Sequence, residues 1–277
     1  MMAIKSILCA YSGEQAEGSG LRHAIQLALY HDAYLTGILR HGRSKMDRRI
    51  ATIVSKDVHR ALHDAEEARA AEVMQRFTDQ TACNGLGDRS NYIDLMPTLG
   101  MSLSQIARTY DLIVTGQHSN HEDDEFMAAD PERIALESGR PVLVVPDKYE
   151  VDTLASHVLI AWDGKRAAAR AIGEAMSMLL EGTHITVVTV GKPQTIDQHP
   201  DGGLVTFLRR HGFEATLLFQ ETNGRPVASV IDAVAKKIGA QLLVMGAFEH
   251  SKFSHNLIGG VTTEIIKSAR IPVLMAN

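Results

Sequence analysis

The sequence predicts an α/β protein made of two tandem, doubly wound domains, each with a parallel sheet. Three observations support this fold class. The chain has 277 residues, which is the length of two ordinary domains. Short apolar runs of Val, Ile and Leu alternate with helical stretches, as in β–α–β units. This alternation also occurs twice along the chain, as expected of an internal repeat.

Three apolar runs of the first half have counterparts in the second: 6–13 with 157–164, 111–116 with 241–246, and 140–145 with 271–275. The first residues of these matched runs are 151, 130 and 131 positions apart. The first half therefore carries an insertion of roughly 20 residues before its fourth strand. We predict two related domains, 1–147 and 156–277.

The second half shows the alternation most clearly. The predicted strands are 157–162, 184–190, 213–219, 241–246 and 272–275, and the predicted helices are 165–181, 202–211, 225–238 and 256–269. The strands are continuous apolar runs, which is typical of a parallel sheet with helices on both faces. Ligands of such sheets bind beyond the carboxyl ends of the strands. We therefore look for a site just after Trp162, Val190 and Met245.

The insertion coincides with the charged, Ala-rich segment 44–82. Its apolar residues form a partly helical stripe that includes Val58, Leu62, Val73 and Phe77. This pattern predicts one or two amphipathic helices that cover the sheet. A helix that binds a partner is the alternative.

The overall composition excludes several classes of protein. The chain has 28 Lys and Arg against 33 Asp and Glu, a net charge of −5, which argues against binding to nucleic acid or an acidic membrane. Cys9 and Cys83 are too few for a thiolate zinc site or a disulfide framework. The polar loop 118–125 lacks the spacing of a calcium loop, so we predict no metal site there. Without a signal-like or membrane-spanning segment, we expect a soluble, cytoplasmic protein.

Glycine residues precede the last predicted helix, where Gly259 and Gly260 are followed by Val261 and Thr262. Small residues let a backbone approach a ligand closely, and the N–H groups at a helix start suit a phosphate. A glycine pair before a helix is a weak signal for phosphate, and tight packing or helix capping is the more common explanation of such residues. The sequence alone leaves both interpretations open.

These residues resemble the universal stress protein family in its tandem form, over nearly the whole chain and best in the second half. The family's ligand loop reads glycine, two residues, glycine, nine residues, then glycine with serine or threonine. Gly246 matches the first glycine and Gly259 the third, while Gly260 replaces the hydroxyl residue. The resemblance implies Rossmann-like domains of the adenine nucleotide alpha hydrolase type, paired as an intrachain pseudo-dimer.

The resemblance also implies a set of binding residues for ATP or another adenine nucleotide. Asp163 matches the family's acidic residue associated with the adenosine part, and Val190 matches its apolar residue after the second strand. The phosphate end corresponds to the strand end and the start of the last helix: Met245, Gly246, Gly259, Gly260, Val261 and Thr262. No catalytic residue and no metal ligand is predicted.

Glu249 departs from the family pattern because it stands where the second glycine is expected. A carboxylate about 5 Å from a phosphate charge, at an effective dielectric of 20 to 80, is repelled by roughly 1–3 kcal/mol. That repulsion weakens the affinity about 5- to 150-fold. We therefore expect a weakened nucleotide site.

The first half departs further from the pattern. Ser12 replaces the acidic residue, and the loop after Gly116 lacks glycine at the expected spacings. We interpret this half as a structural domain without nucleotide binding.

The sequence therefore favours a non-catalytic stress-response protein whose second domain binds an adenine nucleotide weakly. A protein-interaction scaffold whose site Glu249 has closed is the first alternative, and a slow ATP hydrolase is the second. An unidentified protein partner and a homodimer formed through sheet edges fit this interpretation.

Overall fold

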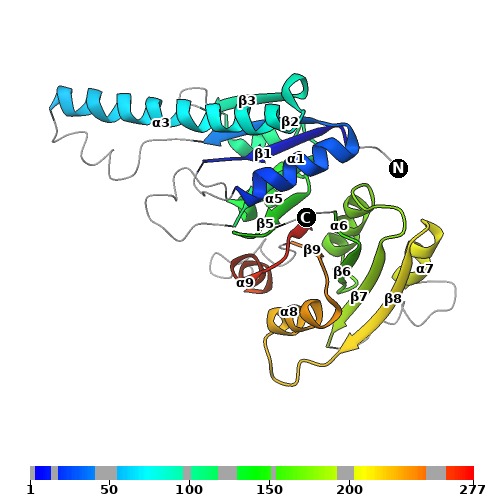
Figure 1. The fold of residues 1–277 in the computed structure, drawn as a ribbon. Coiled ribbons are helices and arrows are strands. Elements are labelled where there is room, and N and C mark those ends of the chain that lie inside the picture. Colours follow the sequence, from blue (N-terminus) through cyan, green and yellow to red (C-terminus); the bar gives the residue numbers. More distant parts are fainter. Residues whose placement is uncertain are drawn as a thin grey trace.

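The computed structural model describes residues 4–13, 18–40, 55–95, 101–117, 130–150, 154–191, 203–247 and 260–277. Within these residues the strands form a single ten-stranded sheet in the order β3-β2-β1-β4-β5-β10-β9-β6-β7-β8 (Figure 1). No helix in the described part of the chain is long and apolar enough to cross a membrane.

Each half of the sheet has the same doubly wound strand order. The strands of the first half are β1 (Ser6–Ala10), β2 (Tyr34–Arg40), β3 (Ser90–Leu95), β4 (Leu112–Gly116) and β5 (Val142–Val145). Those of the second are β6 (His157–Ala161), β7 (His184–Val190), β8 (Glu214–Gln220), β9 (Leu242–Gly246) and β10 (Val273–Ala276). Within each half all neighbouring strands are parallel, which confirms the predicted fold class.

The two halves meet where β5 and β10 pair as antiparallel strands. Leu143 lies opposite Leu274 at the centre of this pairing, and both side chains are fully buried. The antiparallel junction relates the halves by a pseudo-two-fold axis, as expected of a pseudo-dimer. Their two sheets are therefore joined into one. β5 ends at Val145 and β6 begins at His157, so the predicted domain boundary falls in this connection.

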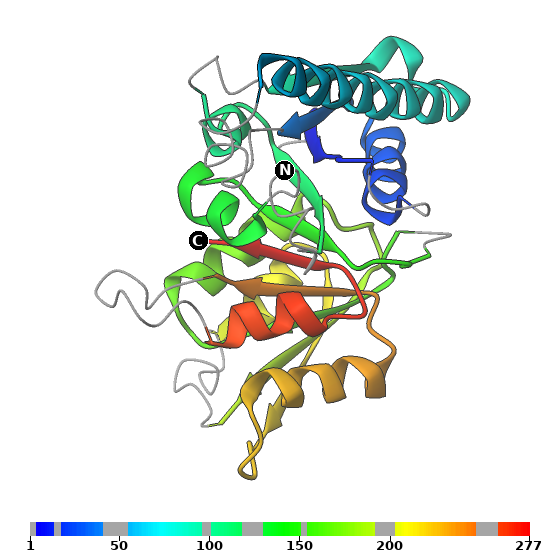
Figure 2. The same cartoon turned by 90° about the vertical axis from the view of Figure 1, so that its left-hand side faces the viewer.

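Helices cover both faces of the sheet over two hydrophobic cores. The face whose core includes Ile7 and Val158 carries α1 (Ser19–His31), α3 (Lys56–Cys83), α6 (Arg166–Met176) and α7 (Gly203–Arg210). The face whose core includes Leu8 and Leu159 carries α4 (Leu103–Ala107), α5 (Pro131–Ser138), α8 (Val227–Ile238) and α9 (Gly260–Ser268). A short 3-10 helix, η1 (Gly87–Arg89), precedes β3. Figure 2 shows α8 and α9 side by side over the strands of the second half.

Local sequence signals explain where several helices begin and end. The Asp130 carboxylate accepts a hydrogen bond from the Arg133 N–H (3.0 Å), and Pro131 occupies the first turn of α5. Gly139 ends the same helix in a left-handed conformation. In α6, the small buried residues Ala167 and Ala171 let the helix lie close to the sheet.

Predicted boundaries in the second half agree with the structure within one or two residues for the strands, whereas the helices are shorter. The helix predicted over 165–181 ends at Met176. The helix predicted over 256–269 is described from Gly260 onward, and 256–259 lie outside the described residues.

The insertion of the first half contains one 28-residue helix, α3. Its carboxyl-terminal part buries Ala70, Val73 and Phe77 against the sheet, as predicted. The amino-terminal part extends beyond the sheet (Figure 1), and there Val58 and Leu62 remain 43% and 45% exposed. The expectation that the whole apolar stripe covers the sheet is therefore wrong, because the helix is longer than the surface it packs on.

Candidate functional site

The carboxyl ends of β6, β7 and β9 meet at the switch point of the second half. From β6 the chain continues to β7 and β8 on one side, and it returns through β9 and β10 on the other. Ala161, the last residue of β6, pairs with Val188 of β7 and with Met245 of β9, so the three strands end within two residues of one another. A crevice for a ligand is expected beyond this edge in sheets of this topology.

Asp163 stands at this edge, directly before α6. Its Oδ1 accepts a hydrogen bond from the Lys165 N–H (3.0 Å), and its Oδ2 lies 3.8 Å from the Lys165 Nζ. Gly164 turns the chain between them with a φ of 75°, a left-handed conformation that glycine adopts without strain. The Asp163 side chain is 56% exposed. Its carboxylate is thus oriented by the turn and still accessible to a ligand.

Gly246 ends β9 where the strand packs on the first turn of α6. A Cβ at this position would lie 2.4 Å from the Ala168 N and 2.7 Å from the Ala167 C atom, both of them backbone. No side chain fits there without moving the helix. Close packing between β9 and α6 therefore accounts for the glycine at 246.

Val190 of β7 and Met245 of β9 are the two other predicted residues at these strand ends. Val190 is half-buried at the end of β7. The Met245 side chain is buried in the core beneath α9, so only its main chain is available at the edge.

The first turn of α9 presents both exposed and buried groups. Gly260 and Val261 are exposed, whereas Thr262 is buried. The Thr263 Oγ1 is buried without a hydrogen-bond partner, and so is the Thr189 Oγ1, one residue before Val190. Buried polar atoms are normally paired. Thr189 follows the alternation of Val187 and Val188 and points to the sheet face that α6 and α7 cover, whereas α9 covers the other face. Only the Thr263 hydroxyl therefore lies beside the first turn of α9.

Two predicted positions, Glu249 and Gly259, lie outside the described residues. The hydroxyls of Thr189 and Thr263 and the side chain of Lys165 are not among the predicted binding residues. The only sequence signal for Lys165 is its place two residues after Asp163, at the expected start of a helix.

The equivalent edge of the first half is covered by α3. A Cβ on Gly13 would lie 2.6 Å from the Val73 Cγ2, so α3 packs directly on the turn after β1. The Tyr92 hydroxyl donates to the Tyr11 carbonyl oxygen (3.1 Å) and fixes the same turn. The turn that corresponds to Asp163 and Gly164 is therefore occupied by the protein itself.

The residue after β4 of the first half joins the two halves. The Gln117 Nε2 donates to the carbonyl oxygens of Ile266 (3.0 Å) and Ala269 (2.8 Å), at the carboxyl end of α9. The missing glycines predict a structural first half, but they do not predict these contacts. The sequence signals for α3 are the charged insertion and its helical apolar stripe, and neither indicates that the helix covers the turn after β1.

Comparison with known proteins agrees with this arrangement. The model of the universal stress protein family matches residues 155–277. The second half of this chain belongs to the universal stress protein family. A universal stress protein of Synechocystis sp. is 30% identical over 193 residues, which cover 62% of this chain and 60% of that relative. The chain thus matches less than two thirds of the relative's length.

Solved structures share the fold of the whole chain. A universal stress protein from Archaeoglobus fulgidus DSM 4304 aligns with a TM-score of 0.72 at 15% identity, over 98% of this chain and 96% of that chain. A protein from Pseudomonas aeruginosa UCBPP-PA14 aligns with a TM-score of 0.59 at 20% identity, over 99% and 93%. At these identities the likeness shows the fold alone.

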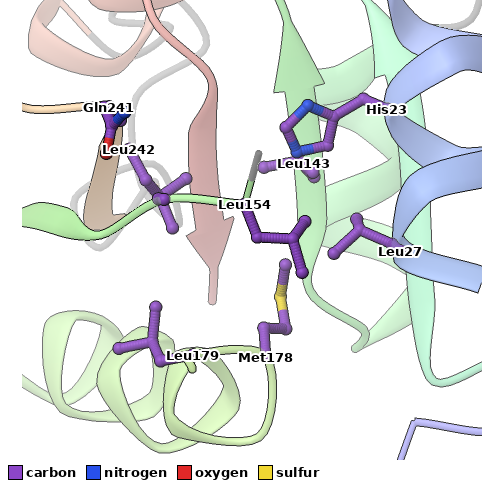
Figure 3. A pocket seen from close by; sticks show the side chains of 9 residues that line it. His23, Leu27, Leu143, Leu154, Met178, Leu179, Gln241 and Leu242 are labelled. Atoms are coloured by element: carbon purple, nitrogen blue, oxygen red, sulfur yellow. The ribbon is translucent and has the colours of Figure 1, made fainter. Parts of the chain in front are cut away.

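A small cavity lies between the two halves, near the amino end of β9 in the universal stress protein domain. Its volume is about 20 Å³, and its lining consists of His23, Leu27, Leu143, Leu154, Ala155, Met178, Leu179, Gln241 and Leu242 (Figure 3). That volume holds about one water molecule, so the cavity is too small for a nucleotide. In Figure 3, Leu27, Leu154 and Met178 converge beside the His23 ring.

The two cysteines differ in accessibility. Cys9 is buried in β1, and burial raises the pKa of its thiol to about 12. A thiol with such a pKa is not a nucleophile at neutral pH. Cys83 is exposed at the end of α3.

Proposed function

We propose that the universal stress protein domain binds an adenine nucleotide weakly beyond β6, β7 and β9, and that it serves a non-catalytic, stress-related role. The observation that carries the proposal is the exposed Asp163 carboxylate, positioned by the turn into α6 at the switch point of the sheet. The first turn of α9 begins at the same edge, because this helix connects β9 to the parallel strand β10.

The available groups suit the two ends of a nucleotide. A carboxylate accepts hydrogen bonds from ribose hydroxyls or from an exocyclic amine, and such charge-assisted bonds are strong. The N–H groups at the start of α9 favour a phosphate through hydrogen bonding and the helix dipole. The unpaired hydroxyl of Thr263, in the first turn of α9, adds one further group able to donate to a ligand.

Glu249 makes the proposed site selective among nucleotides. Its carboxylate replaces a glycine of the family's loop, so each phosphate charge of a ligand nearby is repelled. Adenosine and AMP carry less negative charge than ATP, so the Glu249 carboxylate repels them less. Weak binding of AMP, and still weaker binding of ATP, follows from this charge.

Calorimetric titration of the full chain with AMP tests the role of Asp163. We expect Asp163→Asn to lower the AMP affinity about tenfold or more, since a hydrogen bond to a charged group contributes about 1.5–3 kcal/mol. Asp232→Asn is the matched control, because Asp232 lies on α8, where it pairs with Lys236. Equal AMP affinities for both variants would mean that Asp163 does not contact the ligand.

The same titration with Glu249→Gly separates the proposal from its alternatives. We expect the ATP affinity to rise about 5- to 150-fold, and more than the AMP affinity. If no variant binds either nucleotide, the domain is an interaction scaffold.

A turnover assay tests the remaining alternative. We expect the full chain to hydrolyse ATP no faster than buffer does, whereas ATP turnover that is lost in Thr262→Ala would establish a hydrolase.

A further inference from the structure

The Gln117 side chain connects the first half to α9, the helix that begins at the phosphate end of the proposed nucleotide site. Gln117 follows β4 directly, and its Nε2 donates to the carbonyl oxygens of Ile266 (3.0 Å) and Ala269 (2.8 Å). Ile266 belongs to the last turn of α9, and Ala269 follows the helix. One end of α9 is therefore held by the first half, while the other end begins at the proposed site.

The two carbonyl oxygens fix the orientation of the Gln117 amide. Carbonyls in the last turn of a helix have no partner within the helix, and an amide nitrogen carries two N–H groups that can satisfy two of them. Turning the amide over would place its oxygen against both carbonyl oxygens, with no hydrogen atom between them. The contact therefore defines one position of the end of α9 relative to β4.

The apolar contacts of α9 define its position along its axis less closely. Ile265 and Ile266 are buried in the core beneath the helix. Apolar contacts are non-directional, and they hold the helix against the sheet. A hydrogen bond weakens steeply when its donor and acceptor are shifted, and none remains at about 3.6 Å. We therefore expect the Gln117 bonds to set the axial position of α9.

α9 is short enough to carry this position from its last turn to its first. Its nine residues span about 14 Å at about 1.5 Å per residue. A shift of the last turn along the axis moves the N–H groups of the first turn by a similar amount, because backbone hydrogen bonds make the helix rigid. A phosphate bound there needs N–H···O distances of about 2.7–3.2 Å. Asp163, at the nucleoside end, precedes a different helix, α6. The affinity for phosphate should thus depend on Gln117, and the affinity for the nucleoside should not.

Arg170 makes the equivalent contact in the opposite direction. It lies on α6 of the second half, and its Nη2 donates to the carbonyl oxygen of Gly139 (2.7 Å), the residue that ends α5 of the first half. α5 and α9 precede the two strands that pair at the junction, β5 and β10. Each half thus holds the carboxyl end of the helix before the other's junction strand. Of these two helices, α9 is the one that begins at the proposed nucleotide site.

We propose that Gln117 is a positioning residue for the nucleotide site of the second half: it fixes α9 so that the N–H groups of the first turn meet a phosphate group. The inference rests on the proposed function, because it concerns the phosphate end of the same site. It gives the first half a role in ligand binding, although we expect no nucleotide to bind there.

Calorimetric titration of the full chain with AMP and with adenosine tests the proposal. Gln117→Met nearly keeps the length of the side chain and removes both donors. We expect this variant to bind AMP about tenfold more weakly, the effect of weakening one hydrogen bond to a charged group, and to bind adenosine with unchanged affinity. Gln117→Lys restores a donor to the carbonyls of a helix end, so it should recover most of the AMP affinity.

Gln75→Met is the matched control for the loss of an amide. Gln75 is exposed on α3, where its Nε2 donates to the Asp79 Oδ1 (2.8 Å), and we expect no change in either affinity. AMP affinity that is unchanged in Gln117→Met, or that falls no more than the adenosine affinity does, would overturn the proposal and leave the proposed function standing. A wild-type chain that binds neither ligand would instead refute the proposed function, and this inference with it.

Hydrogen–deuterium exchange of the ligand-free chain measures the hold on α9 without a ligand. We expect faster exchange in Gln117→Met for peptides that cover 260–268, and unchanged exchange for those that cover α8, 227–238. Unchanged exchange over 260–268 would show that Gln117 does not fix the helix and would also contradict the proposal.

Discussion

Gly246→Ala is expected to lower the free energy of unfolding by about 3 kcal/mol, at the upper end of the usual cost of overpacking. The added methyl group would lie 2.4 Å from the Ala168 N, and a backbone atom cannot rotate away as a side chain does. β9 and α6 must therefore separate. For a chain of this size, the thermal unfolding midpoint should fall by roughly 6–12 °C.

Gly116→Ala is the matched control for this substitution. Gly116 ends β4 as Gly246 ends β9, and both are half-buried. Among the described residues, a Cβ on Gly116 would meet no atom within 4 Å, so we expect a change below about 1 kcal/mol. Equal losses of stability in the two variants would contradict the packing explanation for Gly246.

The stability of the protein is expected to fall between pH 6.5 and about 4 because of His23. This side chain is 8% exposed, its Nδ1 has no hydrogen-bond partner, and burial lowers its pKa from 6.5 to about 4. Below pH 6.5 the unfolded chain takes up a proton that the folded chain does not take up until about pH 4. The contribution of neutral His23 is thus complete above pH 6.5 and is lost as the pH falls. Its size is on the order of 3 kcal/mol.

Urea unfolding of wild type and His23→Gln across this pH range measures the effect. We expect the variant to lose less stability between pH 7 and pH 4 than the wild type does. His211→Gln is the control, because His211 is exposed at the end of α7. The Tyr149 ring is the aromatic neighbour of His23, 6.3 Å away between centroids, and it does not titrate in this range. Identical pH profiles for His23→Gln and wild type would exclude His23 as the source.

The fold can be predicted because strands buried on both faces are strongly marked in the sequence. β5 and β10 are continuous apolar runs, and their similarity is one of the three matches that indicate the repeat. The antiparallel pairing that joins them is not predictable from periodicity, which reports burial and not strand neighbours. The resemblance to tandem universal stress proteins is needed to expect a pseudo-dimer.

The length of α3 shows where periodicity fails. Val58 and Leu62 continue the apolar pattern of a helix that buries Val73 and Phe77, yet they lie beyond the edge of the sheet. A helical stripe predicts which face of a helix is apolar, but not how much surface exists to cover it.

The candidate site can be predicted only in part, because its glycines have two explanations. The sequence does not distinguish a glycine that lets a ligand approach the backbone from one that lets a helix pack closely on a strand. At position 246, the Ala167 and Ala168 backbone atoms lie so close that close packing with α6 explains the glycine. Asp163, by contrast, is predicted from the resemblance to universal stress proteins, at the end of the first strand of the second half, and it keeps an exposed carboxylate.

Hydrogen–deuterium exchange of the full chain, with and without saturating AMP, tests most directly the claim that the second half alone keeps a nucleotide site. We predict slower exchange in peptides around 162–166, 188–191 and 260–263, and unchanged exchange in those around 9–13 and 112–117. Protection of the first-half peptides, or no protection in the second half at AMP concentrations that give measurable binding heat, would contradict the account.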